Sequence, residues 1–119
     1  MKIVLVEISG SLPDNKKFPL EGFAVAAKRI FMTGRHSSKM EVDFKHVPSS
    51  ISTSGRDDLL VEISGIKTAT RSIAREILDC TRKTVHDRFG EISFSAVCIV
   101  TDLKNKRVRL QKFFARKPR

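Results

Sequence analysis

The six residues LVEISG occur twice in this chain, at positions 5–10 and again at 60–65. Each copy alternates Val and Ile with Glu and then stops at a glycine, which is typical of a β-strand that ends where the chain leaves a sheet. The identity stops abruptly, because SLPDNKK follows the first copy and IKTATRS follows the second. A catalytic or phosphate-binding motif would extend into its loop, so the repeat indicates two similar halves of one fold.

Hydrophobic periodicity around the two copies predicts two helices and three further strands. The strand at 2–9 is apolar on both alternating sets of side chains, so we expect it to be buried on two faces near the centre of a sheet. The other expected elements are a helix from Pro19 to Gly34, a strand at 39–47, a loop at 48–58, a helix from Thr68 to Phe89 ended by Gly90, and strands at 92–101 and 107–114 joined by a turn at 102–106.

The order of these elements is β-α-β-β-α-β with an added C-terminal strand. It predicts an α+β fold of the ferredoxin-like kind, an antiparallel sheet of about five strands with two helices on one face. A length of 119 residues, with 40% hydrophobic and 30% charged residues, fits a single domain over 1–119. Its C-terminal strand and tail, residues 104–119, are basic.

The positive charge is concentrated in that C-terminal segment. Residues 104–119 hold eight of the 23 Lys and Arg residues and none of the 13 Asp and Glu residues, in a chain with a net charge of +10. On a strand, Arg107 and Arg109 would point to one face and form a row that meets phosphates, and Phe113 would follow as a ring on which bases stack. This asymmetry is the main functional signal in the sequence.

We therefore expect a non-enzymatic protein that binds single-stranded RNA or DNA, mainly through the nucleic-acid backbone, with no cofactor and no metal. Lys67, Arg71 and Arg75 recur at i, i+4 and i+8, so they predict a basic helical stripe beside the C-terminal strand. The expected contact residues are Lys106, Arg107, Arg109, Lys112, Phe113, Arg116 and Lys117, with Lys67, Arg71 and Arg75 as their flank.

Two other classes of function are compatible with the sequence. The first is a protein-binding adaptor, inhibitor or assembly subunit whose basic edge strand docks an acidic partner or forms a homodimer. The second is a small phosphodiesterase or nuclease that uses Glu7 with Glu62, or two of the histidines at 36, 46 and 86, as an acid–base pair or a metal site. The common nucleotide-binding and hydrolase signatures are absent from the sequence.

From Phe23, the order of a helix, MTG, a strand, a Ser-rich loop, LLVEISG and a helix with IAREI is similar to the later portion of a K-homology domain. That family clamps the nucleic-acid backbone with a GxxG loop, and LPDNKKFPLEG at 12–22 has no such spacing. Two predicted strands also follow where that fold would end. The resemblance implies a shared ββα pattern and does not assign the chain to the family.

The remaining features favour an intracellular, cytoplasmic protein. The longest apolar runs, such as SAVCIV at 95–100, are much shorter than the roughly 20 residues of a membrane-spanning helix. Cys80 and Cys98 lack CxxC spacing, so we expect two reduced, buried thiols and neither a zinc site nor a redox motif.

Overall fold

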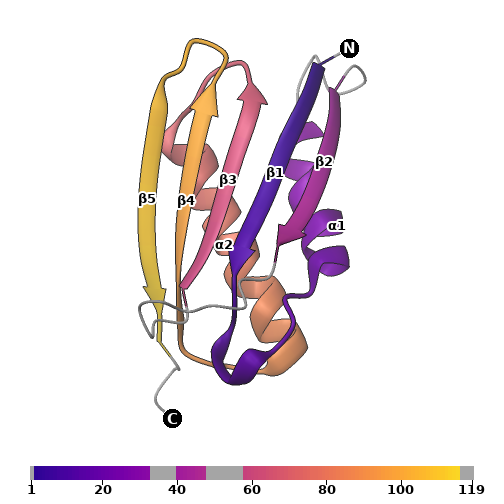
Figure 1. Cartoon of the computed structure of the whole chain (residues 1–119), viewed down its shortest axis with the longest axis vertical. Coiled ribbons are helices and arrows are strands. Elements are labelled where there is room, and N and C mark those ends of the chain that lie inside the picture. The colour runs from indigo at the N-terminus through magenta and orange to yellow at the C-terminus, as the bar shows by residue number, and fades with distance from the viewer. Residues whose placement is uncertain (1, 33–39, 48–57, 116–119) are drawn as a thin grey trace.

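The computed structural model describes residues 2–32, 40–47 and 58–115 (Figure 1). Its elements follow the predicted order, with one short 3₁₀ helix in addition. They are β1 (Lys2–Gly10), η1 (Pro13–Asn15), α1 (Leu20–Met32), β2 (Met40–Val47), β3 (Asp58–Ile66), α2 (Arg71–Phe89), β4 (Phe94–Asp102) and β5 (Arg107–Phe114). The predicted loop at 48–58 lies outside the described residues, except for Asp58.

The five strands form one mixed sheet in the order β2-β1-β3-β4-β5. β1 runs parallel to β2 and β3 runs parallel to β4, whereas the β1–β3 and β4–β5 pairs are antiparallel. The prediction of an α+β fold with five strands and two helices is confirmed, but the antiparallel, ferredoxin-like sheet was wrong. In a ferredoxin-like sheet, the two strands that a helix connects are separated by another strand. Here they are neighbours, because α1 connects β1 to the adjacent β2 and α2 connects β3 to the adjacent β4.

The repeated hexapeptide lies at the centre of the β1–β3 pair. Glu7 is directly opposite Glu62, and Leu5 is opposite Ser64 just as Ser9 is opposite Leu60. Glu7 is the one position that pairs with its own equivalent in the second copy, and the pairs on either side of it are exchanged, so a local twofold axis passes between the two glutamates. This axis relates β1-α1-β2 to β3-α2-β4, which confirms the interpretation of LVEISG as the mark of two similar halves.

The glycines that end the two copies have matching backbone conformations. Gly10 has φ 99° and Gly65 has φ 89°, a region that L-residues with a side chain rarely adopt. Gly65 lies where the register of β3 against β4 shifts, and a Cβ atom there would overlap the backbone carbonyl oxygen of Ile3. Both copies thus need glycine for the turn out of the sheet.

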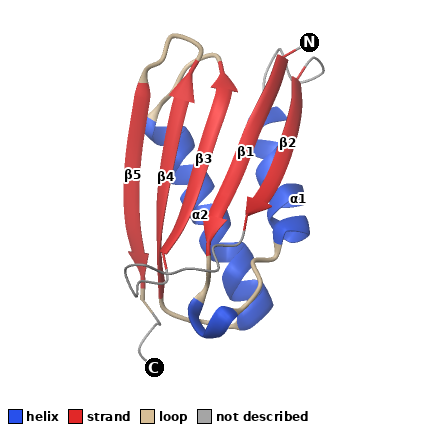
Figure 2. Cartoon of the chain, in the orientation of Figure 1, coloured by secondary structure: helices blue, strands red, loops and turns tan. Residues whose placement is uncertain are grey.

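Both helices pack on one face of the sheet, and no other described element covers the opposite face, which we call the open face (Figure 2). The fully buried side chains lie between the sheet and the helices, and on β1 they are Val4, Val6 and Ile8. The alternate residue Ile3 points to the open face and is 55% exposed, so the prediction that this strand is buried on two faces was wrong. Leu59, Val61 and Ile63 on β3, Phe23 and Ala27 on α1, and Ala74, Ile77, Leu78 and Val85 on α2 complete the centre of this core.

Local hydrogen bonds set both ends of α2. The hydroxyl of Thr70 accepts a hydrogen bond from the backbone N–H of Ile73 at 3.2 Å and caps the helix. The first helical residue is therefore Arg71, three residues after the predicted start at Thr68. At the other end, Gly90 has φ 81° and its N–H donates to the carbonyl oxygen of His86 at 2.9 Å. Gly90 therefore ends the helix as predicted.

Asp102, the last residue of β4, joins the start of α2 to the β4–β5 turn. Its buried carboxylate accepts a hydrogen bond from the backbone N–H of Ala69 at 3.0 Å. The same carboxylate accepts from the N–H groups of Lys104 and Lys106, both at 2.9 Å. The bond from Ala69 is the largest cause that holds the pKa of Asp102 below its ordinary value of 3.8, and the bonds from the turn lower it further.

Replacing Asp102 with asparagine is expected to lower the Tm by several degrees at neutral pH. Because the folded-state pKa lies below 3.8, the stabilisation by the ionised carboxylate is present above that value and is lost as the pH falls through the folded-state pKa. The Tm difference between wild type and variant should therefore shrink in acid. Thermal melts of both proteins at neutral pH and at about pH 2.5 measure this Tm difference. The control is Asp87→Asn, which changes an exposed carboxylate on α2. A difference that does not change with pH would contradict this role.

Candidate nucleic-acid interface

β5 forms one edge of the sheet and presents two different faces. Val108 and Leu110 pack toward the helices against the core, so their neighbours in the strand point to the open face. The open-face side chains, which we call the edge row, are Arg107, Arg109, Gln111 and Phe113. The prediction that the two arginines share one face is confirmed.

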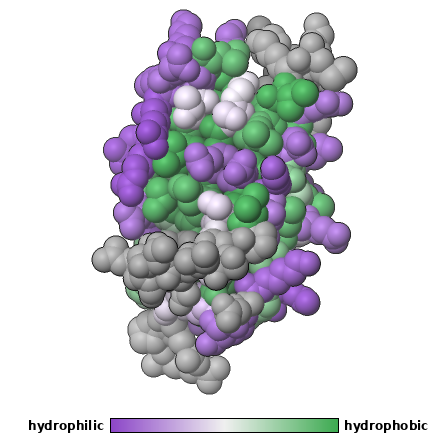
Figure 3. Space-filling view, in the orientation of Figure 1, coloured by the Kyte–Doolittle hydropathy of each residue, from purple (hydrophilic) through white to green (hydrophobic). Residues whose placement is uncertain are grey.

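Every side chain of the edge row is exposed to solvent. The Nη2 atom of Arg109 donates a hydrogen bond to Oε1 of Gln111 at 3.4 Å, and the ring of Phe113 is 68% exposed. At about 3.4 Å per residue, the row extends for roughly 20 Å from Arg107 to Phe113. In Figure 3, hydrophilic side chains follow the β5 edge of the open face, whereas apolar side chains cover much of its middle.

Two further predicted contact residues, Lys106 and Lys112, lie outside the edge row. Lys112 lies on the helix side of β5, and its Nζ is 3.9 Å from a carboxylate oxygen of Asp79 on α2, so part of its charge is balanced. Lys106 is exposed in the β4–β5 turn, at the Arg107 end of the edge row. The predicted contacts Arg116 and Lys117 lie outside the described residues.

The predicted basic flank is not one helical stripe. Lys67 precedes the helix, because α2 begins at Arg71. Arg71 and Arg75 are exposed, and Arg75 lies one turn before Asp79, on the side of α2 that reaches Lys112 of β5. The two helix arginines therefore lie beside β5 on the helix side of the sheet, whereas the edge row of β5 points to the open face.

A pair of carboxylates lies among the apolar side chains near the centre of the open face. Glu7 and Glu62 lie opposite each other on β1 and β3, beside a shallow hollow of about 170 Å³ that Ser64 and Thr101 also line. On the far side of Glu7, its register partner on β2 is Lys45. Within the described ranges 2–32, 40–47 and 58–115, no group of three or more His, Cys, Asp or Glu residues could hold a metal ion. The glutamates are brought together, but as a pair without a third ligand among those residues.

The two described histidines have separate packing roles. Nε2 of His86 is 3.1 Å from the carbonyl oxygen of Ile92, and its ring packs edge-on against Phe94 with centroids 5.9 Å apart. The ring of His46, at the end of β2, packs against Phe18 with centroids 5.6 Å apart. His36 lies outside the described residues, so the structure adds no support for an acid–base pair of histidines.

The thiols lie in unreactive surroundings. Cys98 is buried in β4, and burial raises its pKa to about 12. Cys80 on α2 is partly buried, and burial is the largest cause that raises its pKa too. Because the thiolate is the nucleophile, neither residue is suited to redox chemistry at neutral pH.

Sequence reasoning missed that the strand at 2–9 has one solvated face. The signal was present, because Glu and Ser alternate with apolar residues in both copies of LVEISG, which is the pattern of a strand with one solvated face. Apolar side chains also reach this face. Those that are half-buried or exposed are Ile3, Leu5, Val47, Leu60, Val97 and Phe113.

Fold and site together define an α+β protein with an open mixed sheet and a basic edge strand. No protein-family model matches the chain, and no curated protein has a significantly similar sequence. In the part of the chain that the structure describes, neither helix is both long enough and apolar enough to cross a membrane.

Proposed function

We propose that this protein binds single-stranded RNA or DNA along the β5 edge of its open sheet face. The observation that carries this proposal is the edge row, which sets two exposed arginines and an exposed phenylalanine in line on one face of one strand. Such a combination of a cationic track and a stacking ring is typical of proteins that bind single strands with little sequence preference.

The charge distribution favours a path of the nucleic-acid backbone along β5 over a path across the sheet. Glu62 on β3 lies two strands from β5, at about 4.8 Å per strand, and repels phosphates that approach the centre. Arg107 and Arg109 attract them at the edge. Arginine also suits this role because its planar guanidinium donates two parallel hydrogen bonds to a phosphate.

Phe113 is the stacking surface in this proposal. A phenylalanine that is 68% exposed leaves most of its ring in water, and a base that stacks on it removes that apolar surface from solvent. The ring stands at the end of the edge row, opposite Ser95 of β4. A duplex keeps its bases paired and cannot use the ring in this way.

Replacing Phe113 with alanine is expected to weaken binding of single-stranded RNA or DNA by about 5-fold to 150-fold, because stacking of one base contributes roughly 1–3 kcal/mol. Binding of duplex DNA should change by less than twofold. Fluorescence anisotropy with matched single-stranded and duplex probes measures both. The control is Val25→Ala, which removes an apolar side chain of similar exposure (69%) from α1, on the other side of the sheet. Equal losses for single strands and duplexes would argue against stacking on Phe113.

The open face also favours a second candidate, a protein-binding module. Its apolar side chains are not covered by the helices, and the outer edge of β5 has no neighbouring strand among the described residues. An acidic partner strand, or β5 of a second copy, would fit that edge. The purified protein separates the two candidates: copurified nucleic acid with a high absorbance at 260 nm favours the first, and a nucleic-acid-free complex or homodimer favours the second.

A further inference from the structure

We propose a second ligand site, separate from the edge row, in the cleft between the first turn of α1 and the last turns of α2. We infer that it binds a nucleoside monophosphate, either free or as the 5′-phosphate end of a strand. The cleft has a volume of about 1310 Å³ and is lined from β1, the segment after it, both helices and the end of β2. That volume exceeds the roughly 300–1,000 Å³ of typical small-molecule sites, so a nucleotide fits.

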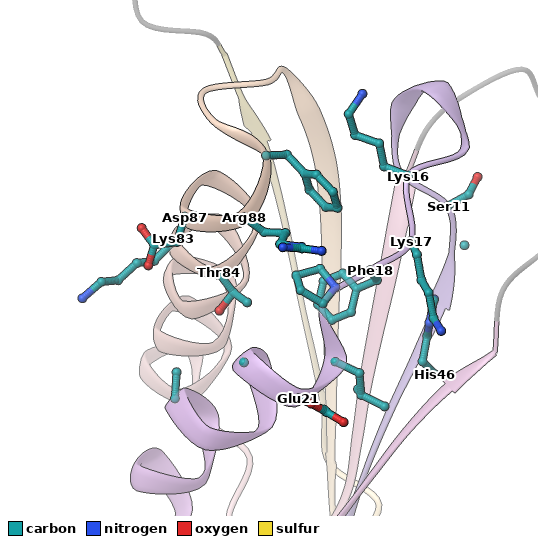
Figure 4. Close-up of a pocket in the computed structure, with 16 residues that line it drawn as sticks. Ser11, Lys16, Lys17, Phe18, Glu21, His46, Lys83, Thr84, Asp87 and Arg88 are labelled. Carbon is teal, nitrogen blue, oxygen red and sulfur yellow. The ribbon is translucent and has the colours of Figure 1, made fainter.

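The charge inside the cleft suits an anion. Lys16, Lys17, Lys83 and Arg88 line it, against two carboxylates, those of Glu21 and Asp87. In Figure 4, Lys83 and Asp87 point away from the interior, whereas Arg88 points toward Phe18 and Lys17 extends on the side of His46. Lys16 is paired with Asp14, with Nζ and the carboxylate oxygen 3.3 Å apart. Lys17 and Arg88 therefore approach the interior from opposite walls.

The first turn of α1 adds backbone donors to these cations. The N–H of Leu20 donates to Phe18 at 2.9 Å and the N–H of Phe23 donates to Pro19 at 3.1 Å. Between them, the N–H groups of Glu21 and Gly22 have no backbone acceptor among the described residues, as expected for a first helical turn. Gly22 is exposed and has no side chain to shield these amides, so a phosphate oxygen can approach them.

The cleft walls also offer a place for a flat ring. The partly exposed rings of the lining are those of His46 and Phe89. His46 packs on the buried ring of Phe18, and the ring centroid of Phe89 lies 6.0 Å from the guanidinium of Arg88. The Nε2 atom of His46 is buried and has no hydrogen-bond partner within the described residues. An unpaired buried nitrogen is unfavourable, and a small rotation of the ring would let a ligand oxygen or ring nitrogen satisfy it. Cations at one end and aromatic walls beside them together select a phosphate attached to a base.

The test is a titration of the ¹⁵N-labelled full chain with AMP, followed by NMR. Binding should shift the Glu21 and Gly22 amide signals saturably, whereas adenosine, which lacks the phosphate, should shift them much less. Lys17→Gln with Arg88→Gln should weaken AMP binding at least tenfold, because each substitution removes a charge-assisted hydrogen bond to the phosphate. The matched control Lys28→Gln with Arg29→Gln removes the same charge from exposed positions of α1 outside the cleft and should leave binding within twofold.

Two outcomes would overturn this proposal. One is no saturable shift at Glu21 and Gly22 up to about 10 mM AMP, an affinity too weak to be useful. The other is equal weakening of AMP binding by the cleft variant and the control variant. That result would mean that AMP is attracted by net charge alone and not by the cleft. AMP binding should survive Arg107→Gln with Arg109→Gln, so failure of this site and failure of the proposed nucleic-acid interface are distinguishable.

The same edge-row variant distinguishes the two sources of the nucleotide. In that background, a short oligonucleotide with a 5′-phosphate is compared with the same oligonucleotide ending in a 5′-hydroxyl. Tighter binding than AMP by the phosphorylated form alone identifies a strand end as the ligand. Tighter binding by AMP than by either oligonucleotide identifies the free nucleotide.

Discussion

Gly65→Ala is expected to lower the free energy of unfolding by about 3 kcal/mol or more, which is a large part of the stability of a small domain. Two effects add at this position. The backbone has φ 89°, which strains any residue with a Cβ, and the new atom would overlap the carbonyl oxygen of Ile3. That oxygen belongs to β1, so relief of the overlap requires β1 and β3 to separate where they pair. Urea unfolding of the variant and wild type measures the loss.

Gly90→Ala is the matched control for this prediction. Gly90 has a similar φ of 81°, but a Cβ there would meet no atom within 4 Å. Only the strain of a backbone conformation that favours glycine remains, with φ 81° and ψ −171°, so the loss should be smaller than at Gly65. Equal losses in the two variants would mean that close approach to β1 does not explain the glycine at the end of LVEISG. A stable Gly65→Ala protein would contradict the β1–β3 geometry altogether.

The double variant Arg107→Gln with Arg109→Gln is expected to weaken binding of single-stranded nucleic acid by about 10-fold to 30-fold at roughly 0.1 M salt. Each phosphate contact on a single strand releases about 0.7 counterion, so two lost contacts reduce the slope of log K against log[salt] by about 1.4. Both side chains are exposed on the edge row, so glutamine should leave the fold intact. Anisotropy titrations across a salt series give both quantities.

Lys28→Gln with Arg29→Gln serves again as the charge-matched control, on the face of the molecule opposite the edge row. It changes net charge equally, so its effect measures non-specific attraction alone. If both double variants lose the same affinity and slope, the edge row has no special part in binding. Arg71→Gln with Arg75→Gln then shows whether the helix side of β5 contributes.

The sequence predicted local structure well, for reasons that particular residues illustrate. Alternation placed Arg107 and Arg109 together and set them apart from Val108, because the side-chain period of a strand is two. The glycine at position 90 marked the end of α2 because few other residues tolerate its conformation. These features depend on neighbours along the chain, which a sequence displays directly.

The neighbours of each strand could not be predicted in the same way. A β-α-β unit can return beside its first strand or one strand further on, and the helix is long enough for either, so the periodicity of α1 and α2 does not distinguish the two folds. The cleft was missed for a related reason. Lys17 and Arg88 are distant in sequence and line one cleft because the start of α1 lies beside the end of α2.

The measurement that tests the central claim most directly is binding of the purified, nuclease-treated protein to labelled single-stranded RNA, single-stranded DNA and duplex DNA across a salt series. We predict sub-micromolar binding of at least one single strand, tighter than the duplex, with a log–log salt slope of about −2 or steeper, which corresponds to three or more phosphate contacts. Binding weaker than about 10⁻⁴ M at physiological salt, with no preference for single strands, would be generic polycation attraction. That result would contradict the nucleic-acid interface and favour a protein partner at the β5 edge.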